Sequence, residues 1–383
     1  LEGGVGALET LLINKSIYNS MSGGDGACLG CAEKTVLHLF TATVTALMQK
    51  RVRTHLTRIE ELIGKLERQV QDGLLGKLSA TELEKALNGL QKEEIHAADL
   101  PLLQQGEPLD VARLKELTET IHKLKELRLR YVEGTTGQGR TALGAVNATG
   151  CSSVWGSTYP VNPYPFPWVN HLFQDAPSMA MGVFEGHMQK MADGFKTIRL
   201  AEWLQNPADR RPDLTYFNWR EFSEEEYLLC PPLAVIGGDG ALYDIGFQNL
   251  SRLMMSGMPI KVLALDTQVY SNTGGQACTS GFTGQVSDMA AYGRARQGKE
   301  EIRKEIALIA MAHRTSYVLQ GSQANAGHLL EGFIEGLRSR RPALFNVYCN
   351  CPPEHGTADD VATKQARLAL ESRAYPVIKY NPD

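Results

Sequence analysis

The sequence LAVIGGDG at residues 233–240 places a short apolar run directly before a glycine-rich turn. A second apolar run, IKVLALD at residues 260–266, leads in the same way into the polar segment TQVYSNTGG at 267–275. Continuous apolar runs of this length are typical of the buried strands of a parallel sheet. Ligands bind such sheets at the carboxyl ends of the strands, so we expect both polar segments to face one site.

Strand-like and helix-like segments alternate through the C-terminal half of the chain. Helical patterns cover 245–256, 302–312 and 326–338, and further strand patterns cover 316–319 and 343–348. This alternation predicts an α/β fold in which helices cover both faces of a parallel sheet. We assign residues 1–383 to this one α/β domain.

Residues 45–140 differ from the rest and are predicted to form an inserted helical arm. Positions 50–140 hold 16 Lys/Arg and 15 Asp/Glu. Their apolar residues recur in steps of three and four, which places each set on one face of a helix. The two sets are Leu56, Ile59, Ile63, Leu66 and Val70, and Leu114, Leu117, Ile121, Leu124 and Leu127. We expect an antiparallel helical hairpin, which is either a solvated arm without chemistry or a docking arm for a partner chain.

The two polar turns can supply oxygen ligands for a cation. Asp239 offers a carboxylate and Thr267, 28 positions later, offers a hydroxyl. These groups and a backbone carbonyl suit an octahedral ion such as Mg²⁺, with diphosphate oxygens completing the shell. Glycines at the strand end let backbone N–H groups approach a phosphate. A single GDG also makes ordinary turns, but the pair of loops is the pattern of thiamine-diphosphate enzymes.

The seven cysteines are Cys28, Cys31, Cys151, Cys230, Cys278, Cys349 and Cys351. Their odd number and wide spacing argue against a secreted disulfide framework, so we expect a reducing, cytoplasmic location. The pair Cys28-x-x-Cys31 could be a redox pair, half of a zinc site or part of an iron–sulfur cluster. Beside a redox coenzyme, a cluster is favoured because zinc cannot accept an electron.

Charge and hydropathy exclude two classes of partner. The net charge is −4 and the isoelectric point is near 6.2, which argues against nucleic-acid binding. No apolar run approaches the roughly 20 residues that a membrane-spanning helix needs.

With these motifs taken together, the chain resembles the C-terminal thiamine-diphosphate-binding domain of the 2-oxoacid:ferredoxin oxidoreductases, the family of pyruvate:ferredoxin oxidoreductase. Six blocks carry the resemblance in order: ACLGCAE (27–33), NATGCSSVWG (147–156), WVNHLFQD (168–175), GDGALYDIG (238–246), DTQVYSNTGGQ (266–276) and YPVIKYNP (375–382). They span most of the chain outside 45–140 and parts of 187–230.

The resemblance implies roles for individual positions. Cys28, Cys31, Cys151 and Cys351 match the ligands of a [4Fe–4S] cluster, with Cys349 as the competitor of Cys351. For the metal, Asp239, Thr267 and the carbonyl of Val269 match the Mg²⁺ ligands. Asn272 matches a catalytic position beside the diphosphate and the reacting carbon, and Glu33 matches a contact to thiamine. The expected coenzyme contacts are Glu33, Cys151, Gly238, Asp239, Gly240, Ala241, Thr267, Gln268, Val269, Tyr270, Ser271 and Asn272.

The implied function is oxidative decarboxylation of a 2-oxoacid, most simply pyruvate, to acyl-CoA and CO₂. The reaction is reversible, and its electrons pass through the [4Fe–4S] cluster to ferredoxin or flavodoxin. Thiamine diphosphate, Mg²⁺ and coenzyme A take part, and other domains or subunits supply the rest of the active site in an oligomer. Two alternatives stay open: a non-redox thiamine-diphosphate decarboxylase or synthase with a structural zinc, and a non-catalytic scaffold subunit. The family has no insertion between the matches to Cys31 and Cys151, which are 120 positions apart here.

Overall fold

The computed structural model describes residues 10, 12–24, 26–74, 110–157, 161–171, 175–207, 210–291 and 297–383. The chain divides into two compact units. Unit 1 comprises Leu1–Gln49, Thr141–Gly186 and Pro231–Asp383, and unit 2 comprises Lys50–Arg140 and His187–Cys230. Among the described residues, no helix has the length and apolar character that a membrane crossing requires.

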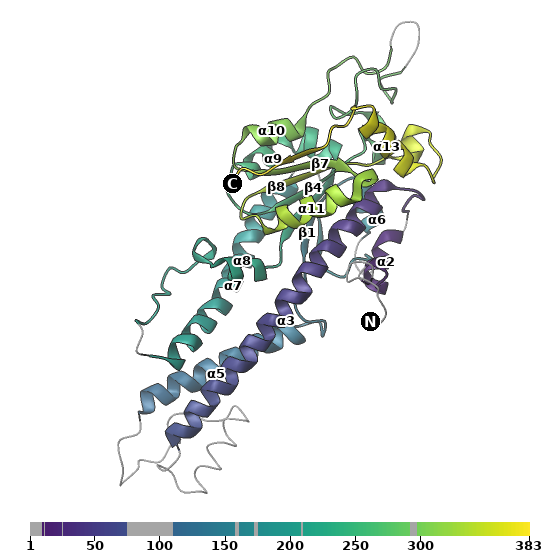
Figure 1. Ribbon diagram of the computed structural model, residues 1–383. Coiled ribbons are helices and arrows are strands. Elements are labelled where there is room, and N and C mark those ends of the chain that lie inside the picture. The colour runs from purple at the N-terminus through teal and green to yellow at the C-terminus, as the bar shows by residue number, and fades with distance from the viewer. Residues whose placement is uncertain are drawn as a thin grey trace, which may run out of the picture. The chain divides into compact units, whose positions relative to one another are not determined.

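Unit 1 is built on a seven-stranded sheet with the order β2-β1-β3-β4-β8-β7-β9 (Figure 1). Every neighbouring pair is parallel except β7 and β9, which are antiparallel. The strands are β1 (Gly144–Ala148), β2 (Trp168–His171), β3 (Leu233–Gly238), β4 (Lys261–Asp266), β7 (Tyr317–Ser322), β8 (Ala343–Tyr348) and β9 (Ile378–Tyr380). A small antiparallel pair, β5 (Val269–Tyr270) with β6 (Gln276–Ala277), follows β4.

Helices cover both faces of this sheet. The crossover from β4 to β7 contains α10 (Ile306–Ala312), and the return from β7 to β8 contains α11 (Ala326–Arg338). These two crossovers run in opposite directions across the sheet, so right-handed connections place α10 and α11 on opposite faces. Helix α9 (Phe247–Met254) connects β3 to β4 in the same direction as the α10 crossover. The predicted α/β fold with a parallel sheet is therefore confirmed.

Helix α11 lies close against the sheet because two of its residues are glycines. A Cβ atom at Gly336 would meet the ring of Phe345 on β8 at 2.5 Å, and one at Gly332 would overlap Leu319 on β7. Phe40, in the first part of α3 (Ala32–Leu74), packs on the same layer. Its ring centroid lies 5.3 Å from that of Phe333 and 5.8 Å from that of Phe345. This layer fixes the start of α3 against the sheet.

Most predicted elements of the C-terminal half are present. The strand predicted at 343–348 and the helix predicted at 326–338 have those bounds. The helix predicted at 302–312 begins only at Ile306, because the preceding residues make other contacts: the Arg303 side chain donates to the Ala374 carbonyl and the Lys304 N–H donates to the Thr279 carbonyl. Strands β1 and β2 were not predicted.

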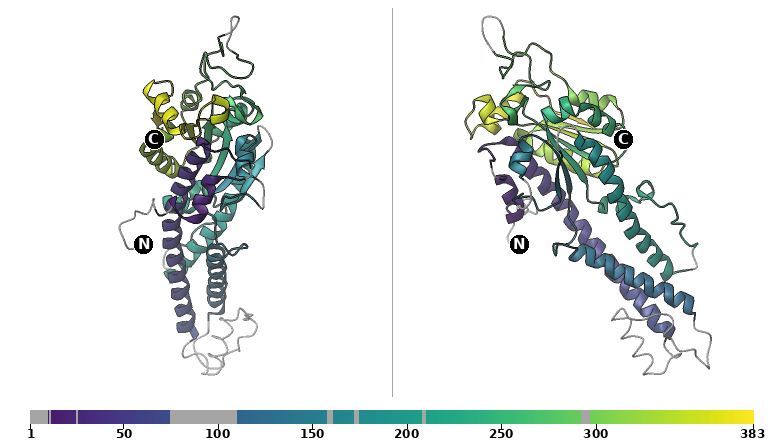
Figure 2. Two further views of the ribbon diagram at one scale, coloured as in Figure 1. Left: turned by 90° about the vertical axis from the view of Figure 1, so that its right-hand side faces the viewer. Right: turned by 180° about the vertical axis from the view of Figure 1, so that it is seen from behind.

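Unit 2 contains an antiparallel pair of helices, the second part of α3 and α5 (Val111–Val132), which lie side by side in both views of Figure 2. Glu67 of α3 pairs with Lys125 of α5 at 2.8 Å, and Glu60 pairs with Arg128 at 2.7 Å. Because the later residue of one helix pairs with the earlier residue of the other, the two helices are antiparallel. Most predicted apolar positions are buried between them: Ile59, Ile63, Leu66, Val70, Leu114, Leu117, Ile121, Leu124 and Leu127. Residues 75–109 of the predicted arm lie outside the described residues.

Residues 187–230 also belong to unit 2, although the predicted arm comprised only 45–140. They include the second part of α7 (Ala176–Gln205) and α8 (Glu224–Leu229). Arg199 and Glu226 form an ion pair at 2.7 Å, and the rings of Phe195 and Phe222 meet edge to face at 4.9 Å. The Gln69 side chain of α3 donates to the Gln205 carbonyl at 3.2 Å. The helical pair is thus packed against a second, sequence-distant segment.

A buried histidine lies inside unit 2. His55 is 4% exposed, and both of its ring nitrogens are without a hydrogen-bond partner. Its ring packs against Tyr131 and Phe195 at centroid distances of 5.1 and 6.3 Å. Burial, together with the nearby charges of Arg58 and Arg140, lowers the pKa of His55 to about 4. The folded unit therefore holds this ring in its neutral form.

We predict that His55 makes unit 2 sensitive to acid. In the unfolded chain the His55 ring takes up a proton below about pH 6.5, whereas in the folded chain it does so only near pH 4. The free energy of unfolding therefore falls as the pH is lowered from 6.5 to 4. The loss due to His55 approaches about 3 kcal/mol at its lower end. Urea unfolding of wild type and His55→Leu at several pH values should show the two stabilities diverging as the pH falls.

The exposed His122 on α5 provides the matched control. His122→Leu removes a histidine from the surface of the same helical pair and should not reproduce the effect of His55→Leu. A His55→Leu protein that loses stability below pH 6.5 as steeply as wild type would contradict the assignment.

Candidate functional site

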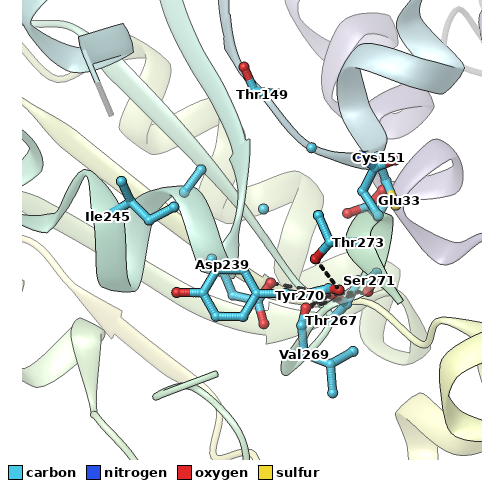
Figure 3. Close-up of a pocket in the computed structure, with 15 residues that line it drawn as sticks. Glu33, Thr149, Cys151, Asp239, Ile245, Thr267, Val269, Tyr270, Ser271 and Thr273 are labelled. Carbon is cyan, nitrogen blue, oxygen red and sulfur yellow. Dashed lines mark hydrogen bonds between the residues drawn. The ribbon is translucent and has the colours of Figure 1, made fainter. Parts of the chain in front are cut away.

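A cavity of about 170 Å³ lies at the carboxyl ends of β1, β3 and β4 in unit 1 (Figure 3). Its lining consists of Glu33, Thr149, Gly150, Cys151, Gly238, Asp239, Gly240, Ala241, Ile245, Thr267, Val269, Tyr270, Ser271, Asn272 and Thr273. β3 and β4 pair with Gly238 opposite Leu265, so the residues that follow each strand reach the same place. The two polar segments therefore meet, as their positions after parallel strands require.

Three oxygen atoms converge within this site. The Thr267 hydroxyl lies 3.3 Å from Asp239 Oδ1 and 3.1 Å from the Val269 carbonyl oxygen. An octahedral Mg²⁺ with ligands at about 2.1 Å has neighbouring ligand oxygens about 3 Å apart. Both measured separations match this distance between neighbouring ligand oxygens. The donor set of carboxylate, hydroxyl and carbonyl oxygen is also one that Mg²⁺ prefers. These residues thus fit the magnesium ion expected from the sequence.

Asp239 is almost fully buried, and its two oxygens have different surroundings. The Ser280 hydroxyl donates to Oδ2 at 2.7 Å, while Oδ1 faces Thr267. Burial and the neighbouring charge of Asp266 raise the pKa of Asp239 well above its usual range. A buried carboxylate in such a place is stable as an anion only beside a cation or several donors.

The turn between β4 and β5 shapes the ligand loop. The N–H of Gln268 donates to Asp266 Oδ1 at 3.1 Å, and the Gln285 side chain donates to the Gln268 carbonyl at 3.1 Å. Gln268 has a φ of 66°, a left-handed conformation that is uncommon for residues other than glycine. This turn brings the Val269 carbonyl back toward the Thr267 hydroxyl.

Gly240, the second glycine of the GDG turn, is required for steric reasons. A Cβ atom at Gly240 would meet the ring of Tyr270 at 2.5 Å, so only glycine fits there. Gly240 begins a π-helical turn that ends at Ile245. Within that turn Asp244 accepts a hydrogen bond from the Tyr270 hydroxyl at 2.8 Å and another from the Thr279 N–H at 3.3 Å. The loop that carries Val269 is thereby anchored to the end of β3.

Glu33 enters the cavity from the first turn of α3. The indole N–H of Trp155, on α6 (Cys151–Gly156), donates to Glu33 Oε2 at 2.7 Å. Burial raises the pKa of Glu33 to about 7, although the bond from Trp155 works in the opposite direction. The Cys31 thiol lies 3.9 Å from the same carboxylate oxygen. Glu33 therefore lies between the cavity and the first cysteine pair.

The four cysteines expected to bind a cluster are all free thiols. Burial raises the pKa of the Cys151 thiol, and the charges of Glu33, Cys351, Cys31 and Cys28 add to this effect. Cys349 is fully buried, and its thiol donates to the Val347 carbonyl at 3.4 Å. In the part of the chain that the structure describes, no three or more His, Cys, Asp or Glu side chains are arranged so that they could hold a metal ion. The thiols are thus neighbours without forming a compact ligand set.

Most of the predicted coenzyme contacts line the cavity, including the proposed catalytic Asn272. Gln268 does not line it; its side chain is buried, and its backbone forms the turn instead. Sequence analysis missed Thr149 and Gly150, because it did not recognise β1, which ends directly before them. It also missed Asp244 and Ser280, whose roles depend on contacts between segments far apart in sequence.

Comparison with known proteins agrees with this geometry. Residues 229–347 match the C-terminal TPP-binding domain of thiamine pyrophosphate enzymes. A pyruvate:ferredoxin oxidoreductase of Moorella thermoacetica is 29% identical over 281 residues, which cover 62% of this chain and 23% of that protein. A mitochondrial NADP⁺-dependent pyruvate dehydrogenase of Euglena gracilis is 30% identical over 276 residues, which cover 62% of this chain and 15% of that protein.

Among solved structures, a 2-oxoglutarate:ferredoxin oxidoreductase of Magnetococcus marinus shares 16% identity over 66% of each chain, with a TM-score of 0.41. The chain spans less than a quarter of the length of the two curated relatives above. The sequence matches confirm the resemblance expected from the six blocks. The chain is therefore similar to the thiamine-diphosphate-binding part of 2-oxoacid:ferredoxin oxidoreductases, and its residues 229–347 match a thiamine pyrophosphate enzyme domain.

Proposed function

We propose that this chain binds thiamine diphosphate through Mg²⁺ and forms part of an enzyme that oxidatively decarboxylates a 2-oxoacid. The convergence of Asp239, Thr267 and the Val269 carbonyl beside a cavity is the observation that carries the proposal. Pyruvate is the proposed substrate because the relatives are named for it. The products are then an acyl-CoA and CO₂, in a reversible reaction.

The chain's own residues would bind and orient the coenzyme. Asp239, Thr267 and Val269 would hold the metal and, through it, the diphosphate. Gly238 and Gly240 leave the backbone at the end of β3 open to the phosphate oxygens. Once bound, thiamine diphosphate supplies a carbon nucleophile and an electron sink for the 2-oxoacid. Asn272 and Glu33 line the same cavity and are the side chains proposed to face the reacting end.

We further propose that Cys28, Cys31, Cys151 and Cys351 bind a [4Fe–4S] cluster. Cysteine thiolates are the usual ligands of such clusters. The other three thiols lie near enough to Cys151 to raise the pKa of its thiol, which supports the assignment. Cys351 is preferred to Cys349, because Cys351 is partly accessible, while Cys349 is fully buried and its thiol donates to the Val347 carbonyl. Electrons would leave toward ferredoxin or flavodoxin, after which curated relatives are named.

The rest of the active site would come from other domains or subunits, since the relatives are several times longer than this chain. The first segment of unit 2, Lys50–Arg140, falls in sequence between Cys31 and Cys151. Together with the second segment, His187–Cys230, it is proposed to be an elaboration of this domain that docks a partner chain.

We predict that Asp239→Asn weakens thiamine diphosphate binding. The substitution keeps the shape of the side chain but removes the charge that would hold the cation against the diphosphate. Calorimetric titration in the presence of Mg²⁺ should show an affinity at least about tenfold lower, which corresponds to roughly 1.4 kcal/mol. Thr267→Val should act in the same direction with a smaller effect.

Asp360→Asn, a charge change at an exposed position of the same unit, is the control and should bind normally. Equal affinity of Asp239→Asn and wild type would refute the magnesium site. A wild-type protein that binds no thiamine diphosphate would refute the proposed function as a whole.

For the cluster, we predict that serine at position 28, 31, 151 or 351 lowers iron content well below that of the wild-type protein. The broad visible absorption that dithionite bleaches should be lost in parallel. Iron and acid-labile sulfide analysis of anaerobically purified protein measures this directly.

Cys230→Ser and Cys349→Ser are the matched controls, since both thiols donate to backbone carbonyls and should leave the iron content nearly unchanged. Full iron in Cys151→Ser would disprove the assignment. Zinc in place of iron in the wild-type protein would favour a non-redox thiamine-diphosphate enzyme with a structural metal.

A further inference from the structure

His355 contacts the ligand loop from a distant part of the sequence. It is the last residue of α12 (Pro352–His355), a short helix that begins directly after Cys351. Its Nε2 atom lies 2.8 Å from the carbonyl oxygen of Thr267. A carbonyl oxygen can only accept, so the ring must donate its Nε2 hydrogen. Sequence analysis gave this residue no role.

This bond holds one end of a peptide unit whose other end is also held. The Thr267 carbonyl and the Gln268 N–H belong to the same planar group. His355 donates to the carbonyl at 2.8 Å, and Asp266 accepts from the N–H at 3.1 Å. With both ends bonded, the plane of this peptide has a single orientation. The Thr267 side chain and the Gln268 backbone start from that plane.

The residue that follows this peptide is strained. The left-handed conformation of Gln268, at φ 66°, is unfavourable for a residue with a Cβ atom. Such conformations persist only where the surroundings fix them. Here the surroundings are Asp266, Gln285 and His355, each of which bonds the backbone of the turn. The turn directs the Val269 carbonyl to within 3.1 Å of the Thr267 hydroxyl.

Further contacts join the same two segments. Gly275 has a φ of 82°, and a Cβ atom there would overlap the Glu354 carboxylate, so the glycine loop lies directly against α12. The hydroxyl of Ser271, in the same loop, is 2.7 Å from that of Thr267. The His355 N–H in turn donates to the Cys351 carbonyl at 3.0 Å. The segment 351–355 thus contacts the loop 267–275 through Glu354 and His355.

We propose that His355 is a positioning residue for the metal and coenzyme: its bond to the Thr267 carbonyl holds the Thr267 hydroxyl and the Val269 carbonyl in the arrangement that receives Mg²⁺. This inference rests on the proposed function. It assigns to the segment after Cys351 a second task besides cluster binding, namely support of the metal-binding loop.

The test compares His355→Leu with His355→Gln in the full chain. Leucine fills similar volume without a donor, whereas the amide nitrogen of glutamine can take the place of Nε2. We expect His355→Leu to need at least about threefold more Mg²⁺ for half-maximal thiamine diphosphate binding, measured by calorimetry over a series of Mg²⁺ concentrations. His355→Gln should restore most of the wild-type Mg²⁺ requirement.

His328 supplies the matched control. His328 is on α11, and its Nε2 atom is paired at 3.0 Å with the carbonyl of Gln320 on β7. His328 is not among the residues that line the cavity. His328→Leu loses the same type of bond, so it should lower the melting temperature without changing the Mg²⁺ requirement. If only stability mattered, both leucine variants would change the Mg²⁺ requirement alike. If His355 positions the metal-binding loop, only His355→Leu raises the Mg²⁺ requirement.

Two outcomes would overturn the inference while leaving the proposed function intact. One is a His355→Leu protein with the wild-type Mg²⁺ requirement. The other is a glutamine variant as impaired as the leucine variant although both melt at the wild-type temperature. If wild type itself binds no thiamine diphosphate at any Mg²⁺ concentration, the proposed function fails, and the inference fails with it.

Discussion

The parallel pairing of β3 with β4 is the constraint on which the site depends. Gly238 lies opposite Leu265, so Asp239 and the Asp266–Thr267 pair leave the sheet at the same level. A slip of one residue in this register would turn every side chain of one strand to the other face. Both strands are completely buried along their apolar positions, which fixes the register. The burial of aliphatic side chains therefore sets the positions of the oxygen atoms about 3 Å apart at the strand ends.

That pairing also brings two carboxylates close together inside the protein. Asp266 is fully buried and has lasting partners: the Tyr243 hydroxyl at 3.0 Å, the Gln268 N–H and, at 3.9 Å, the guanidinium of Arg303. Asp239 has the Ser280 hydroxyl and the Thr267 hydroxyl but no cationic side chain within ion-pair distance in the described residues. The fold thus gives the carboxylate that shapes the turn a cationic partner, whereas the proposed Mg²⁺ would be the cationic partner of Asp239.

Sequence reasoning succeeded where local pattern and final environment agree. The runs 260–266 and 343–348 are mostly apolar because both faces of their strands are covered. The alternation of strand and helix defined the fold class. Strand β1 was not predicted because its five residues include a glycine and a buried asparagine, Asn147. The Asn147 side chain donates a hydrogen bond to Asn170 on the neighbouring strand. The second segment of unit 2 was missed for a related reason: α7 is a single helix whose residues contribute to both units. His355 and Asp244 could not be found from spacing, because their partners lie 88 and 26 positions away and only the fold brings them together.

The contact between Gly240 and Tyr270 has an evolutionary consequence. The space that a side chain at position 240 would need is filled by the tyrosine ring, and that ring in turn carries the hydroxyl that bonds Asp244. A descendant that replaced Gly240 by alanine would have to lose the ring at position 270 as well, and Asp244 would then keep a charge without its nearest phenol donor. Substitution at Gly240 is therefore coupled through the Tyr270 ring to the hydrogen bonding of Asp244.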